Sequence, residues 1–209
     1  MLRVGYIDED EGQRNSFHHL FKDEFEVILF EITEETNAEN LVDEVLKSAI
    51  DVLVLDFRLD ENGLVDFNAD KLVEGIQAIN LFYPLVVLTS HEVDALDHLE
   101  NAHLVNGKDD MLDSKIDIFK QKLRSIALDN KRKIESAEAE LKKLEEKRIN
   151  GGFDSKEEDR YVELSSFLDQ TISAKGRVSR SFYSEHTNKK LDDLIGLAEQ
   201  MLNKMPDQE

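Results

Sequence analysis

Short apolar runs alternate with segments of helical period through the first 110 residues, and this alternation restricts the possible fold more than any other feature. Val52–Leu55 and Leu85–Leu88 are continuous aliphatic stretches, the pattern of strands buried on both faces of a parallel sheet. Between such runs the apolar residues recur at intervals of three and four, as in helices that cover a sheet. The alternation indicates right-handed β-α-β units.

Five strands and four helices can be placed from these patterns. The predicted strands are Arg3–Ile7, Phe25–Ile32, Val52–Leu55, Leu85–Leu88 and His103–Val105. The predicted helices are Gln13–Phe21, Ala38–Ala49, Leu72–Leu81 and Val93–Leu99. We therefore expect an α/β fold with a five-stranded, parallel, doubly wound sheet of flavodoxin-like size.

The second half of the chain follows a different pattern and is rich in Glu, Lys, Leu and Ala. Apolar residues at 3-4-3 spacing predict a long helix from Ile116, with a break in the heptad at Asn130. A glycine pair at 151–152 predicts its end, and Asp154 followed by Glu157 predicts the capping box of a second helix. A last helix is predicted after Thr187.

Charge divides the chain in the same way. Residues 1–110 contain 26 Asp and Glu against 7 Lys and Arg, a balance of −19, whereas residues 111–209 contain 20 against 19. Such asymmetry indicates two modules. We place an α/β domain at 1–125 and an all-α helical hairpin or coiled-coil extension at 126–209. The total charge of −20 argues against nucleic-acid binding, because it repels phosphate backbones.

Composition excludes further classes of protein. No window contains 18 consecutive apolar residues, so we expect no membrane span, and no secretory signal peptide is recognisable. The absence of cysteine excludes disulfides, thiolate zinc sites and thiol catalysis. These features predict a cytoplasmic protein.

Polar residues follow the predicted strands at the points where a parallel sheet binds ligands. They are Asp8-Glu9-Asp10, Asp56, Thr89-Ser90 and Asn106-Gly107-Lys108. Converging carboxylates repel one another unless a cation lies among them, and ligands that are all oxygen suit Mg²⁺. Carboxylates, a hydroxyl and an ammonium group around Mg²⁺ are typical of phosphoryl transfer, with a carboxylate as nucleophile.

Three segments closely resemble the receiver domain of response regulators. They are Val4–Arg14, with its acidic pair and an arginine early in the following helix, Ile50–Asp56 and Pro84–Ser90. The resemblance implies that Asp56 is the phosphoacceptor and that Thr89 closes onto the phosphoryl group. It also implies that Mg²⁺ is held by Asp8, Glu9, Asp56 and the backbone carbonyl of Arg58.

The match departs from the family pattern near the fifth strand. Aligned without a gap, Asn106 takes the place of the family's lysine and Gly107 that of its usual proline. Lys108, two residues later, is then the candidate phosphate partner through a shift of the loop. The segment between Thr89 and the fifth strand is short, so its helix is expected to be small.

The resemblance implies that the protein is a response regulator of a two-component system. A histidine kinase or phosphotransfer protein would be the phosphodonor, and the protein would be no enzyme beyond self-phosphorylation and autodephosphorylation. The helical module is expected to bind a protein partner, with homodimerisation first. Two alternatives stay open: a pseudo-receiver scaffold that phosphorylation does not control, and a phosphoryl reservoir or shuttle.

Overall fold

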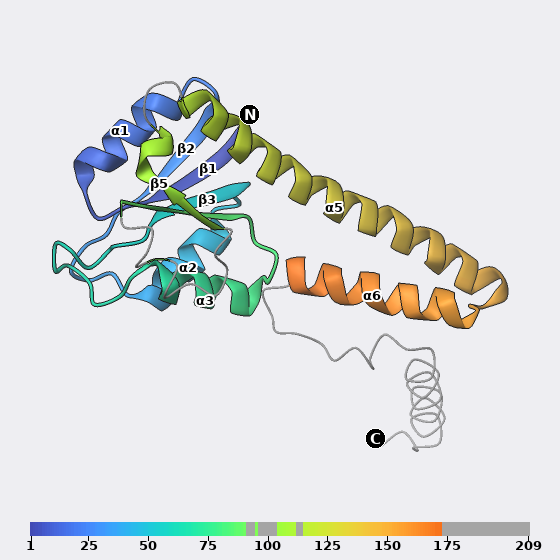
Figure 1. The fold of residues 1–209 in the computed structure, drawn as a ribbon. Coiled ribbons are helices and arrows are strands. Elements are labelled where there is room, and N and C mark those ends of the chain that lie inside the picture. The colour runs from blue at the N-terminus through green and yellow to red at the C-terminus, as the bar shows by residue number, and fades with distance from the viewer. Residues whose placement is uncertain (91–94, 96–103, 112–114, 173–209) are drawn as a thin grey trace, which may run out of the picture. The chain divides into compact units, whose positions relative to one another are not determined.

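A computed structural model describes residues 1–90, 95, 104–111 and 115–172 (Figure 1). The chain separates into two compact units, Met1–Lys133 and Ile134–Glu209. The division lies inside the long helix that sequence pattern predicts from Ile116, eight residues after the predicted boundary at 125. Most of the helix predicted at Val93–Leu99, and all of the one predicted after Thr187, lie outside the described residues.

The first unit contains the predicted five-stranded parallel sheet, in the order β2-β1-β3-β4-β5. Its strands are β1 (Leu2–Ile7), β2 (Phe25–Phe30), β3 (Val52–Asp56), β4 (Leu85–Thr89) and β5 (Val105–Gly107). Helices α1 (Glu11–Phe21), α2 (Ala38–Lys47) and α3 (Ala69–Ile79) follow strands of this sheet, and a 3₁₀ helix, η2 (Lys108–Met111), follows β5. The α/β fold class predicted from the alternation of patterns is confirmed.

The fifth strand is the element whose predicted position was wrong. The sequence pattern predicts a strand at His103–Val105; His103 lies outside the described residues, and β5 starts at Val105 and ends at Gly107. Backbone pairing with β4 determines this register, because Val105 pairs with Val87 and Gly107 pairs with Thr89. Pairing with the neighbouring strand therefore determines where β5 lies, whereas local hydrophobicity placed the start of the strand two residues too early.

Several helix ends differ from the predicted ones. Helix α1 starts two residues before the predicted Gln13, because the Asp10 carboxylate accepts a hydrogen bond from the backbone N–H of Gln13 at 2.8 Å. Helix α2 ends at Lys47 rather than Ala49, and Ala49 adopts a positive φ of 52°. The apolar periodicity by itself does not mark these ends.

Two hydrophobic clusters cover the two faces of the sheet. Helices α2 and α3 pack on one face, and α1 together with the first turns of α5 (Ile116–Gly151) packs on the other. Gly5 lies in central strand β1, where a Cβ atom would come within 2.4 Å of Ile50 Cδ1 and 2.9 Å of Phe30 Cε2. Ile50 and Phe30 are themselves buried, so the packing requires glycine at this position.

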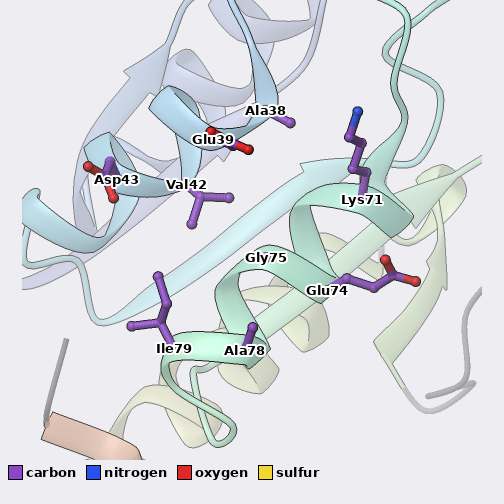
Figure 2. Close-up of a pocket in the computed structure, with 9 residues that line it drawn as sticks. All are labelled: Ala38, Glu39, Val42, Asp43, Lys71, Glu74, Gly75, Ala78 and Ile79. Atoms are coloured by element: carbon purple, nitrogen blue, oxygen red, sulfur yellow. The ribbon is translucent and has the colours of Figure 1, made fainter. Parts of the chain in front are cut away.

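A groove of about 490 Å³ lies between α2 and α3 (Figure 2). Its apolar lining includes Val42 and Ile79, and acidic residues such as Asp43 and Glu74 border it. Gly75 lets the two helices approach closely, because a Cβ atom there would lie 3.0 Å from Val42 Cγ2. This groove is separate from the carboxyl edge of the sheet.

The described part of the second unit consists of the end of α5 and helix α6 (Ser155–Ile172). Gly152, with φ of 80°, follows the last residue of α5. The predicted capping box is present: the Asp154 carboxylate accepts from the Glu157 amide at 3.0 Å, and the Glu157 carboxylate accepts from the Asp154 amide at 3.2 Å. Arg160 of α6 donates to both carboxylate oxygens of Glu140 at 2.7 Å each.

Candidate functional site

Three carboxylates meet at the carboxyl edge of the sheet. Asp8 and Glu9 follow β1, and Asp56 is the last residue of β3, so the parallel pairing of these strands brings them together. Each offers an oxygen within 4.8 Å of those of the other two. All three residues are buried, Asp8 completely and Asp56 with 4% exposure. The predicted acidic cluster is therefore present in the geometry.

Lys108 supplies the ammonium group of this site. Its Nζ lies 3.0 Å from Asp56 Oδ2 and 3.3 Å from Asp8 Oδ2. The lysine directly follows β5, because that strand ends at Gly107 rather than at Val105. The corrected register gives a physical reason for its position, and the predicted loop shift is not needed.

Asn106, which the ungapped alignment placed in the lysine position, makes other contacts. Its side-chain amide donates to the Leu104 carbonyl at 2.8 Å, and its Oδ1 accepts from Lys122 of α5. Asn106 therefore joins β5 to α5, while the ammonium group beside Asp56 comes from Lys108.

Thr89 and Arg58 lie on the two segments next to Asp56. Thr89 is the last residue of β4 and is 1% exposed. Arg58 lies in the loop after β3, which Asn68 holds in place: the Asn68 side-chain oxygen accepts from the Leu59 amide at 2.9 Å. The Phe57 amide also donates to the Leu88 carbonyl at 2.8 Å, which anchors the start of this loop to β4.

Burial changes the acidity of Asp56 and Glu9. Desolvation raises the pKa of Asp56 to about 6, although Lys108 opposes the shift, and desolvation also raises the pKa of Glu9 to about 7. Burial by itself would lower the pKa of Lys108, but Asp56 and Asp8 outweigh it and raise that pKa. Asp56 and Glu9 thus lie in a place that disfavours their negative charge, and a bound cation relieves this effect.

The residues fit a hard cation such as Mg²⁺. The donors are all oxygen, as Mg²⁺ prefers. Among the described residues, Glu9 Oε2 is buried and has no hydrogen-bond partner, so one carboxylate oxygen of the cluster stays available for a ligand. Asp8, Glu9 and Asp56 would hold the ion, and the Arg58 carbonyl is the further ligand that the receiver resemblance implies.

Two contacts of Asp8 were not predicted from the sequence. The Tyr6 hydroxyl donates to Asp8 Oδ2 at 2.7 Å, and Arg14 of α1 donates to the Asp8 carbonyl at 2.6 Å. A tyrosine hydroxyl in the buried second half of β1 is the signal that could have pointed to this contact, because a buried tyrosine usually has a hydrogen-bond partner.

Comparison with known proteins adds no relative: no family model, curated protein sequence or solved structure matches the chain. No helix within the described residues combines the length and the apolar character needed to cross a membrane.

Proposed function

We propose that the first unit is a receiver-type signalling domain that accepts a phosphoryl group on Asp56. The observation that carries the proposal is the position of this carboxylate, beside the Lys108 ammonium at 3.0 Å and next to Asp8 and Glu9. A carboxylate nucleophile beside a fixed cationic group, with two further carboxylates that could hold a metal ion, suits transfer of a phosphoryl group to an aspartate. The donor is a histidine kinase or a histidine phosphotransfer protein.

In this proposal an Asp56 oxygen attacks phosphorus while the bond between phosphorus and the donor's imidazole nitrogen breaks. The nitrogen keeps the electron pair of that bond, and the product is an acyl phosphate on Asp56. Lys108 stabilises the added negative charge. The hydroxyl of Thr89, at the end of β4, donates a hydrogen bond to a phosphoryl oxygen. Asp8, Glu9 and Asp56 would hold Mg²⁺, which would supply positive charge that stabilises the phosphoryl oxygens.

The output in this proposal is protein binding by α5 and α6. Both helices are rich in acidic and basic residues, and the second half of the chain has a near-neutral balance without a basic stripe, which favours a protein partner over DNA. Homodimerisation through a coiled coil is the first form of contact to test.

The experiment is phosphorylation of the full-length chain with a small phosphoryl donor and Mg²⁺, followed by intact mass measurement. The wild type should gain one phosphoryl group, Asp56→Asn should gain none, and chelation of Mg²⁺ should abolish the gain. Asp60→Asn is the matched control, because it removes an aspartate from the loop directly after β3 and should leave labelling intact. Equal labelling of wild type and Asp56→Asn would refute the assignment.

The same preparation separates the alternatives. No labelling of a folded wild type would favour the pseudo-receiver scaffold. Labelling that changes the molar mass in light scattering supports a switch, whereas labelling that decays quickly without such a change favours a phosphoryl shuttle.

A further inference from the structure

Tyr6 is a buried polar residue that the proposed chemistry does not use. Its side chain is 0% exposed and lies in β1, two residues before the acidic pair. Its hydroxyl donates to Asp8 Oδ2 at 2.7 Å, and the same oxygen lies 3.3 Å from Lys108 Nζ. The other oxygen, Oδ1, accepts from the Asp10 amide at 2.9 Å. Donors therefore engage both oxygens of Asp8.

The ring of Tyr6 is fixed by a stack of aromatic side chains. It lies parallel to Phe17 of α1, with 4.0 Å between ring centroids and 4° between ring planes. Phe17 stacks in turn on Phe21 at 4.2 Å, and Phe119 of α5 meets Phe21 edge-on at 6.0 Å. Phenylalanine would fill this position equally well, so packing does not explain the hydroxyl. Its contact with Asp8 does.

We propose that Tyr6 is a positioning residue of the acidic site, which holds the Asp8 carboxylate for the cation. The inference rests on the proposed function of that site. A ligating carboxylate is itself held by outer hydrogen bonds, and losing such a partner commonly weakens metal binding. The stacked ring restricts the hydroxyl, and the hydroxyl restricts the carboxylate.

The neutrality of the phenol is part of the inference. With all three carboxylates ionised, the cluster and Lys108 together carry a net charge of −2, which matches a divalent cation. A second lysine or an arginine in place of Tyr6 would also satisfy Asp8, but it would lower the attraction for the cation. A hydroxyl donates a hydrogen bond without adding charge.

The test is a calorimetric Mg²⁺ titration of the full-length wild type and of Tyr6→Phe. The substitution keeps the aromatic stack and removes only the hydroxyl, and we expect Mg²⁺ affinity to fall about tenfold. Tyr83→Phe is the matched control, because it removes a half-buried tyrosine hydroxyl, one that contacts the Val45 carbonyl at 3.5 Å. The Mg²⁺ affinity of Tyr83→Phe should equal that of the wild type.

Tyrosine absorption provides a second measurement. If Tyr6 only supported the fold, Mg²⁺ would not change the tyrosine spectrum. The chain contains four tyrosines and no tryptophan, so a change at one phenol is visible in the near-ultraviolet spectrum. Mg²⁺ should shift this spectrum in the wild type and in Tyr83→Phe, because the ion withdraws electron density from the carboxylate that Tyr6 contacts. Tyr6→Phe should lack the shift.

The outcomes separate the inference from the proposed function. A wild type that binds no Mg²⁺ overturns the proposed function and, with it, this role of Tyr6. A wild type that binds Mg²⁺ without a tyrosine shift overturns the inference alone, whether or not Tyr6→Phe folds. So does a folded Tyr6→Phe with unchanged affinity. Phe17→Leu keeps the hydroxyl but loses one stacked ring, and it should retain the shift with a smaller loss of affinity.

Discussion

The two units treat their charged groups in opposite ways. In the first unit, burial raises the pKa values of Asp56 and Glu9. In the second, hydrogen bonds from Arg160 and Lys147 lower the pKa values of Glu140 and Glu157, which lie at the surface and are partly exposed. Burial of poorly solvated carboxylates therefore lowers the stability of the first unit. In the second unit, ion pairs at the surface contribute to stability instead. We expect the reactive site in the first unit, because carboxylates whose burial destabilises the fold are typical of functional sites.

The largest expected difference concerns the hydrophobic core. Leu53 is completely buried in β3, and Leu53→Ala should lower the free energy of unfolding by about 2–5 kcal/mol. Leu141→Ala in the second unit should cost clearly less, because Leu141 is only half-buried. Urea unfolding followed by circular dichroism measures both. Equal losses would contradict the distinction between a packed core and a surface-stabilised helical unit.

The second prediction concerns pH in the absence of Mg²⁺. Because the folded-state pKa of Asp56, about 6, exceeds the unfolded value of 3.8, the stability that its protonation provides is complete below the unfolded pKa. It is lost as the pH rises through about 6. The melting temperature of the first unit should therefore be lower at about pH 7.5 than at about pH 5.

The control for this prediction is Asp56→Asn, which does not titrate and should show a smaller difference between the two pH values. Mg²⁺ should recover stability at the higher pH. In the second unit the sign reverses, because the lowered pKa values of Glu140 and Glu157 give stability that is lost as the pH falls. A melting temperature of the first unit that rises with pH would be inconsistent with costly burial of Asp56.

The third prediction concerns the start of α6. Asp154 accepts hydrogen bonds from the amides of Lys156 and Glu157, so Asp154→Ala should destabilise the helix by about 1 kcal/mol. Hydrogen exchange of the first turn of α6 should become faster, while exchange in β3 should not change. Faster exchange in both places would show that the units unfold together.

The smallest expected effect is that of the Arg160–Glu140 ion pair. Both side chains are more than 40% exposed, so Arg160→Ala should cost about 0.5 kcal/mol in spite of its two hydrogen bonds. High salt should reduce the loss further. Thermal melting of the variant at low and high ionic strength provides the check. A loss that is independent of salt would point to packing by the arginine stem instead.

Much of the fold could be predicted, because β3 and β4 are continuous aliphatic runs and the helices follow a clear period. The acidic cluster followed from the rule that parallel strands bring their carboxyl ends to one edge. The register of β5 could not be predicted, since pairing with β4 determines it and Val105–Gly107 lacks an apolar run. The contact of Tyr6 with Asp8 could not be predicted either, because the position of the hydroxyl depends on how the Tyr6 ring packs against Phe17.

Gly5 has a consequence for the way in which this chain can vary. A side chain at this position would collide with Ile50, Phe30 and Leu53, the last at 3.1 Å. A homologue with alanine or a larger residue at position 5 should therefore carry smaller residues at positions 30 or 50 as well. Correlated substitution of these positions would identify distant homologues of this fold even where overall identity is low, and it would do so without reference to the acidic site.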